Sequence, residues 1–171
     1  QLVSPMNPSP CGFVGDRDRS SRCSPEQIAR YQGRISGPLL DRLDLHIHVP
    51  RPPPAALLVR DGVGENSATV AGRVAAARER QATRGSPNAR LPPDRLLSAC
   101  DAEQRALAIL EAAAARFHLS ARSCHRLLRV ARTIADLDHN ERVAVPHVSE
   151  ALAMRSLDRG QAGAGTAAPV R

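Results

Sequence analysis

The stretch SGPLLDRLDLHIHV, residues 36–49, joins a Gly-Pro turn to an arginine flanked by two aspartates, and then to an alternating apolar and polar segment. The alternation has the period of a half-buried β-strand with one apolar and one polar face. The apolar face would hold Leu43, Leu45, Ile47 and Val49, and the polar face Asp44, His46 and His48. We therefore expect a strand over residues 43–49 with Arg42 at its N-terminal end.

Arg42 is the first candidate for a functional side chain. A guanidinium group stays charged at every relevant pH and presents a planar fork of donors that matches phosphate oxygens. Held by a rigid turn, it is well placed to meet a phosphate group. The alternative is an ion pair with Asp41 or Asp44, and the spacing alone favours that alternative.

Three blocks of the sequence, taken together, resemble a known family. They are LVSPMNPSPCG with Asn7, SGPLLDRLDLH with Arg42, and LSARSCHRLLRVARTIADL with Arg122. Their content and order are similar to the C-terminal half of the magnesium-chelatase-like AAA+ ATPases, and most of all to the YifB/ComM family, whose members look like competence-related DNA motors. The resemblance covers nearly the whole chain, from the sensor-1 segment through the helical lid.

The resemblance implies a role in ATP hydrolysis for each of these residues. Asn7 matches the sensor-1 residue, although an Asn-Pro turn would also explain it. Arg42 matches the arginine finger that reaches into a neighbouring subunit's site, so Arg42 and Asn7 are the candidate catalytic residues. Arg122 matches the sensor-2 arginine and is the candidate cofactor-binding residue. The implied cofactor is ATP with Mg²⁺, the implied assembly is a homo-hexamer, and the implied partner is DNA, in recombination or competence.

The nucleotide-binding part of such an ATPase is absent from this sequence. No phosphate-loop motif GxxxxGK[ST] occurs, and the chain contains no lysine. Residues 1–3 read as the end of a strand that begins upstream, so we expect the chain to be a fragment. Although the full-length family is an ATPase family, this chain alone is expected to be inactive.

The composition allows a core and permits a nucleic acid partner. The chain has 171 residues, of which 42% are apolar, enough for one ordinary domain or two small ones. Its net charge of +7 comes from arginine alone, a pattern that fits a GC-rich genome as well as a polyanion partner. Few aromatic residues are present, so any nucleic acid contact would run mainly through phosphates. A non-enzymatic helical module that binds nucleic acid or protein is the alternative function.

No run of about 18 apolar residues and no signal-peptide pattern occurs, so we expect no membrane contact and a cytoplasmic location. The expected fold is an α+β fragment, mostly α, in which the tail end of an AAA+ α/β core precedes a helical lid bundle. The expected parts are a core remnant at 1–49, a proline-rich linker at 50–66, a lid at 67–157 and a disordered tail at 158–171.

Caps and periodicity predict the helices. The sequences SPEQ and DAEQ carry the capping-box pattern, and serines or prolines mark the other starts. The expected N-caps are Ser67, Asp101 and Ser120, and the expected first helical residues of the other two helices are Pro25 and Pro146. The residues expected to face the lid core are Val70, Val74, Ala77, Leu107, Leu110, Ala114, Phe117, Cys124, Leu127, Leu128, Ala131, Ile134, Ala135, Val148, Ala151 and Leu152.

Arg122 also has an argument that is independent of the resemblance. It would lie in the first turn of the helix that Ser120 caps, where the helix dipole disfavours a cation by roughly 0.3–1 kcal/mol. A bound phosphate would compensate, because it gains from both the helix terminus and the guanidinium group. The alternatives are a carboxylate such as Asp101 or Glu103, or a side chain that extends into water.

The same helix carries further charged residues. Arg126 and Arg129 would continue a basic stripe, which is either a solvated face or a face toward DNA. Arg132 and Asp136 are spaced as a helix-stabilising i, i+4 pair.

The cysteine pattern departs from the one that the resemblance implies, which is CPCG and then CxC before SPEQ, four thiolates suited to zinc. Here Ser9 and Ser21 replace two of the four, and Cys11 and Cys23 remain. Hydroxyl groups are poor zinc ligands, so we predict no tight zinc. Hydrogen bonds would hold the loop instead, or the two cysteines would approach one another. The pair His46 and His48 is expected on an exposed strand face.

Overall fold

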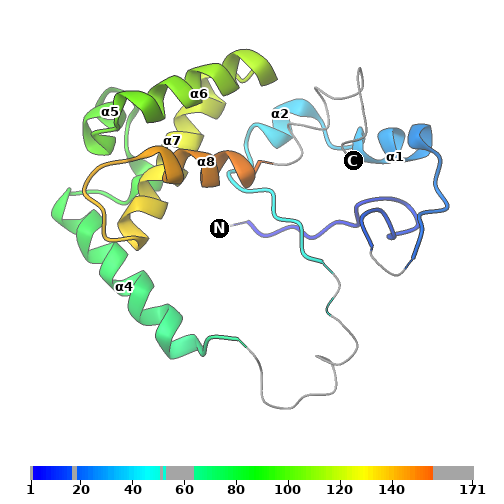
Figure 1. The fold of residues 1–171 in the computed structure, drawn as a ribbon, viewed down its shortest axis with the longest axis horizontal. Coiled ribbons are helices and arrows are strands. Elements are labelled where there is room, and N and C mark those ends of the chain that lie inside the picture. Colours follow the sequence, from blue (N-terminus) through cyan, green and yellow to red (C-terminus); the bar gives the residue numbers. More distant parts are fainter. Residues whose placement is uncertain (1, 17–18, 51, 53–63, 156–171) are drawn as a thin grey trace. The chain divides into compact units, whose positions relative to one another are not determined.

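A computed structural model describes residues 2–16, 19–50, 52 and 64–155, and these residues are mostly helical (Figure 1). Their only β-type pairing is an isolated bridge between His46 and Arg155. The mostly α class is therefore confirmed, whereas no sheet of an AAA+ core forms within the described ranges. The expected disordered tail and most of the expected linker lie outside the described residues. None of the described helices combines the length and hydropathy that a membrane crossing requires.

The chain divides into two compact units. The first consists of residues 1–40 and 48–63, and the second of residues 41–47 and 64–171. The second unit thus contains the segment that carries Arg42, which we expected in the core remnant of residues 1–49. This segment joins the helices because its hydrogen bonds run to them, as shown below.

The first unit contains helices α1 (Pro25–Gln32) and α2 (Gly37–Leu40). The expected capping box of α1 is confirmed: the Gln27 amide donates to Ser24 Oγ at 3.2 Å, and the Ser24 amide donates to Gln27 Oε1 at 2.9 Å. The strand expected before Asn7 is wrong for the described residues, which have no regular secondary structure there. Gln1 lies outside the described residues.

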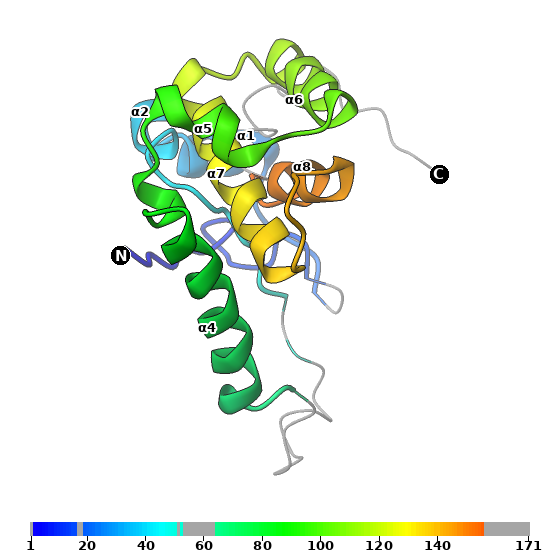
Figure 2. The ribbon, with the colours of Figure 1, turned by 90° about the vertical axis from the view of Figure 1, so that its left-hand side faces the viewer.

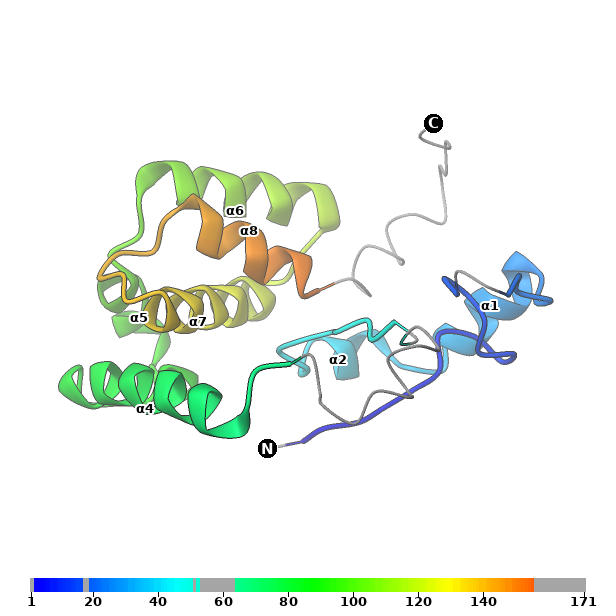
Figure 3. The same ribbon diagram turned by 60° about the horizontal axis from the view of Figure 1, so that its bottom comes forward.

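The second unit is a helical bundle built around α7 (Ala121–Leu137). Helix α7 packs against its neighbours along its whole length, and Figure 3 shows α6, α8, α7 and α4 in that order. The other elements are α4 (Ser67–Thr83), the 3₁₀ turn η1 (Asn88–Arg90), α5 (Pro93–Cys100), α6 (Gln104–Phe117) and α8 (Val145–Ala153). The bundle therefore places the helix that carries Arg122 at its centre.

The inward face predicted for α7 is confirmed except at Cys124, which is half-buried. Its buried apolar residues are Leu127, Leu128, Ala131, Ile134 and Ala135. They join Leu96, Leu110, Val143, Val148 and Ala151 in one core. Burying one large aliphatic side chain contributes about 1.5–3 kcal/mol, so this core is the main source of the unit's stability.

Two of the predicted caps are wrong. The N-cap of α4 is Asn66, whose Oδ1 accepts from the Thr69 amide at 2.8 Å. DAEQ does not open a helix at Asp101, which is the left-handed residue (φ 40°) after α5. Glu103 then caps α6 without a side-chain hydrogen bond. The N-cap of α5 is Pro92, which makes no side-chain capping hydrogen bond, so no capping residue predicts this helix.

The predicted faces of α4 and of residues 43–49 also need correction. Val70 and Val74 are exposed, and α4 extends beyond the rest of the bundle at its N-terminal end (Figure 2). Residues 43–49 do not form a strand. Leu45 and Ile47 are exposed, whereas His46 is buried. A strand needs a neighbouring strand along its edge to pair its backbone groups, and the described part of this segment forms only an isolated bridge. The carbonyl of Leu43 and the amide of His46 bond instead to groups at the end of α8.

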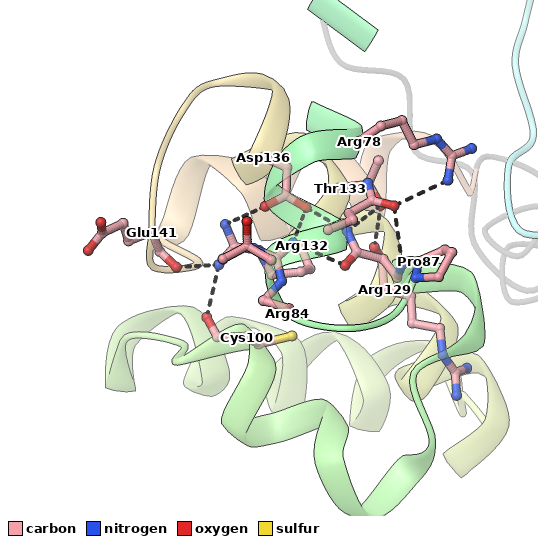
Figure 4. A network of polar contacts seen from close by, with 12 residues as sticks. Arg78, Arg84, Pro87, Cys100, Arg129, Arg132, Thr133, Asp136 and Glu141 are labelled. Atoms are coloured by element: carbon pink, nitrogen blue, oxygen red, sulfur yellow. Dashed lines mark hydrogen bonds and ion pairs between the residues drawn. The ribbon is translucent and has the colours of Figure 1, made fainter. Parts of the chain in front are cut away.

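A buried polar network joins α4, η1 and α7 (Figure 4). Asp136 accepts from Arg84 and from Asn88 Nδ2 at 2.7 Å, and it forms an ion pair with Arg132, whose Nη2 lies 3.1 Å from its Oδ1. Arg132 also donates to the carbonyls of Asn140 and Glu141 and to that of Cys100 at 3.4 Å. The predicted Arg132–Asp136 pair is confirmed, and it is part of a larger network.

Candidate functional site

The segment of residues 41–47, called here the finger segment, lies against the N-terminal half of α7 and the end of α8. Its anchors include both side chains and backbone groups. They are the side chain of Asp41, the carbonyl of Arg42, the carbonyl of Leu43, the side chain of Asp44 and the amide of His46. Nearly every residue around Arg42 is thus tied to a helix.

The first anchor is at the N-terminus of α7. Ser120 caps this helix, with its Oγ accepting from the Ser123 amide at 3.1 Å. Both hydroxyls then donate to Asp41, Ser123 to Oδ1 at 2.7 Å and Ser120 to Oδ2 at 3.1 Å. The hydrogen bond from Ser123 holds the pKa of Asp41 below its ordinary value, and Arg155 and Arg122 add to this lowering. An anion at this position is favoured by the helix dipole.

The second anchor is Arg126, one turn further along α7. Its Nη1 donates to the carbonyl oxygen of Arg42 at 2.7 Å and to Asp44 Oδ1 at 2.6 Å. A guanidinium group can serve both acceptors at once because its donors are fixed in one plane. Arg126 therefore holds the backbone of the residue expected to be the finger.

The third anchor is the end of α8. Arg155 is buried, and its Nη1 donates to the carbonyl of Leu43 at 3.3 Å. The amide of His46 donates to the carbonyl of Met154 at 2.6 Å, next to the isolated bridge between His46 and Arg155. The finger segment is thus held by two helices at once.

The three predicted site residues fall in different parts of the molecule. Arg42 and Arg122 belong to the second unit, and both are exposed. Both are associated with Asp41, one as its neighbour in sequence and the other through its charge. Asn7 is exposed and belongs to the first unit. The structure therefore brings two of the three residues into one unit.

Arg42 and Arg122 fit a phosphate ligand in their chemistry. Both residues are exposed, and Arg122 lies in the first turn of α7, where the helix terminus favours an anion. The hydroxyls of Ser120 and Ser123 at this terminus already bind the carboxylate of Asp41. The carboxylate that lies at this terminus is Asp41, whereas Asp101 is paired with Arg142 at 2.9 Å. The carboxylate whose charge interacts with that of Arg122 is therefore Asp41, the neighbour of Arg42 in sequence, and neither Asp101 nor Glu103.

The expected basic stripe on α7 is not a free face. Arg126 is bonded to the finger segment, and Arg129 donates twice to the carbonyl of Leu91, at 3.1 and 2.8 Å. Two of its three arginines therefore have intramolecular partners, which weakens the reading of the stripe as a DNA-binding face.

The four positions of the expected cysteine motif come together in the first unit. Cys11 Sγ lies 3.4 Å from Ser9 Oγ and 3.3 Å from Ser21 Oγ, and Cys23 also contacts it. Hydrogen bonds from Ser21 and then Ser9 lower the pKa of Cys11 to about 5. No group of three or more His, Cys, Asp or Glu side chains in the described ranges is arranged to hold a metal ion.

Comparison with known families agrees with this arrangement. Residues 64–155, which include the whole helical bundle, match the family described as "Magnesium chelatase, subunit ChlI C-terminal". Residues 1–57 match "Magnesium chelatase, subunit ChlI". The chain belongs to the magnesium chelatase family. The break between the two matches falls inside the linker expected at residues 50–66.

Within this magnesium-chelatase-like family, the similar proteins are of the YifB and ComM kind. The chain is 45% identical over 160 residues to the uncharacterized protein YifB of Escherichia coli, and 43% identical over 161 residues to the competence protein ComM of Haemophilus influenzae. A protein of Mycobacterium tuberculosis, Rv2897c, is 36% identical over 160 residues. These matches cover 91–93% of this chain and 31% of each relative. The chain thus spans about a third of the length of its relatives.

Proposed function

We propose that this chain is the C-terminal portion of an ATP-dependent ring motor that acts on DNA in the cytoplasm, in recombination or competence. The observation that supports the proposal most is that Arg42 and Arg122 belong to the same compact unit and that both residues are exposed. Membership of the magnesium-chelatase-like family supports nucleotide and Mg²⁺ use in general. The competence name of the Haemophilus influenzae relative favours action on DNA.

Each candidate residue has a defined task in this proposal. ATP with Mg²⁺ supplies the phosphoryl group that is transferred to water. Arg122 would bind phosphate oxygens from the first turn of α7, where the helix terminus adds its own favourable field. Arg42 would place positive charge at the nucleotide site of the neighbouring subunit, and Asn7 would orient the attacking water.

A ring follows from the role proposed for Arg42. A finger acts on a neighbour's site, and identical subunits joined head to tail form a closed ring when their rotation closes. We propose a homo-hexamer. A non-enzymatic nucleic-acid-binding module remains the second candidate because the chain has a net charge of +7.

The test uses the full-length protein that contains this chain. Arg42→Ala is expected to lower ATP turnover by about 10³-fold or more while nucleotide binding is retained, because a finger stabilises only the transition state. Arg122→Ala is expected to weaken nucleotide binding as well. Arg73→Ala is the matched control, since Arg73 is an exposed arginine of the same unit that pairs only at the surface with Glu65.

Turnover and the binding of a fluorescent ATP analogue would be measured on each variant. Wild-type turnover by Arg42→Ala would exclude the finger role. If neither turnover nor nucleotide binding is found in the full-length protein, and DNA binding by the chain falls steeply with salt, the second candidate is correct.

A further inference from the structure

The finger segment is anchored by hydrogen bonds at several consecutive residues. Side-chain anchors lie on both sides of Arg42, at Asp41 and Asp44, and its own carbonyl is bonded between them. The side chains that bind these three groups, Ser123 and Arg126, both belong to α7. These bonds therefore tie the backbone on both sides of Arg42 to α7.

The same two turns of α7 carry Arg122. Ser120 and Ser123, which bind Asp41, flank Arg122 in sequence, and Arg126 follows one turn later. A displacement of the N-terminal end of α7 must therefore move Arg122 and the backbone of Arg42 together, or break these hydrogen bonds.

We propose that Asp41 and Arg126 are positioning residues that lock the finger segment to α7, so that Arg42 and Arg122 move as one body. The inference rests on the function proposed above, and it adds to that function the residues that set the position of the finger. Neither Asp41 nor Arg126 has to touch the nucleotide. Their effect on turnover arises from the placement of Arg42, and a misplacement of about 1 Å in a catalytic group can cost about 10²-fold in rate.

Arg126→Ala in the full-length ring is the first variant, because it removes the bonds to Arg42 and Asp44 without changing the finger segment. The matched control is Arg129→Ala. Arg129 lies on the same helix, is half-buried like Arg126, and also donates to a backbone carbonyl, but its acceptor is Leu91, outside the finger segment. Asp41→Ala removes the anchor on the other side.

Turnover is expected to fall by about 10- to 100-fold in Arg126→Ala and in Asp41→Ala, with nucleotide binding retained. Arg129→Ala is expected to stay within about twofold of wild type. Arg126→Lys, which keeps a donor and the charge, is expected to recover part of the loss. Hydrogen exchange of residues 42–47 in the same rings should become faster in the two anchor variants and stay unchanged in the control.

A second readout separates positioning from a loss of folding. Arg126→Ala subunits keep their own nucleotide site, so mixing them with Asn7→Ala subunits, which keep an intact finger, should restore turnover. If Arg126→Ala subunits stay inactive in such mixed rings, the variant has a structural defect and the inference is wrong. If Arg42→Ala is inactive but Arg126→Ala has wild-type turnover, the inference fails while the proposed function stands. Wild-type turnover by Arg42→Ala would remove the proposed function itself.

Discussion

Replacing Asp136 by asparagine probes the buried network that joins α4 and η1 to α7. The substitution keeps the volume of the side chain but removes its charge and one of its two acceptors. Arg132, whose side chain is fully buried, would lose its carboxylate partner at 3.1 Å, and Arg84 would lose its ion pair. Breaking a buried pair by removing one partner typically costs about 3–5 kcal/mol.

Two features of the network bear on this magnitude. The side chain of Arg84 is 26% exposed and can regain water, which places the expected cost near the lower end, about 3 kcal/mol. Burial lowers the pKa of Arg132, and the charge of Asp136 opposes this effect. With a neutral asparagine at position 136, the charged form of Arg132 is therefore less stable in the folded protein. In a unit of about 100 residues, a loss of this size lowers Tm by more than about 10 °C.

The assay is urea unfolding of the chain, followed by helical circular dichroism. The matched control is Glu65→Gln, which breaks an ion pair whose side chains are 51% and 53% exposed. An exposed pair contributes less than about 1 kcal/mol, so this control should unfold almost as wild type does. An unfolding free energy of Asp136→Asn within about 0.5 kcal/mol of wild type would refute the reasoning that this network stabilises the bundle.

Three further predictions concern the site and the first unit. Cys11, with a pKa of about 5, should react with iodoacetamide at pH 6, whereas Cys124, whose pKa burial raises, should react only in alkali; equal rates by mass spectrometry would contradict this. The lowered pKa of Asp41 means that its stabilisation is fully present above about pH 5 and is lost as the pH falls through its folded pKa. The unfolding free energy of wild type should therefore fall more in acid than that of Asp41→Asn. Parallel pH profiles of the two unfolding free energies would contradict a stabilising role of the Asp41 carboxylate. The chain alone should hydrolyse ATP only at background, and turnover by a clean preparation would overturn the need for an upstream phosphate loop.

The parts of the fold that could be predicted are those fixed by neighbours in sequence. The capping box at Ser24 and the N-cap at Ser120 act over three residues, and both are present as expected. The inward face of α7 follows from the helical period. A pattern of this kind needs no knowledge of the rest of the chain.

The parts that could not be predicted depend on distant partners. Asp136 meets Arg84 and Asn88, which lie 52 and 48 residues earlier in the chain. The alternation over residues 43–49 has the period of a strand, but the period does not say whether a partner strand is present. DAEQ likewise has the sequence pattern of a capping box, but the pattern does not show that Asp101 is the C-cap of the preceding helix α5.

The sequence suggested the candidate site residues, but it did not predict the hydrogen bonds between the finger segment and α7. The dipole argument correctly required a compensating group for Arg122, and Asp41 at the start of α7 is a carboxylate that meets this need. It joins this helix terminus from 82 residues away, so spacing could not find it. The spacing predicts that Arg126 belongs to a stripe that is either solvated or turned toward DNA, and it does not reveal the acceptors in the finger segment, which are equally remote in sequence.

The most direct test of the account is turnover by mixed rings of two inactive variants of the full-length protein. Arg42→Ala subunits keep their own site, and Asn7→Ala subunits keep the finger. In a random equal mixture, about a quarter of the interfaces join an intact site to an intact finger, because each subunit faces its neighbour head to tail. The account predicts that ATP turnover returns to roughly that fraction of wild type, although each variant alone is inactive. A mixture that stays as inactive as its components would contradict an arginine that acts on the neighbouring subunit.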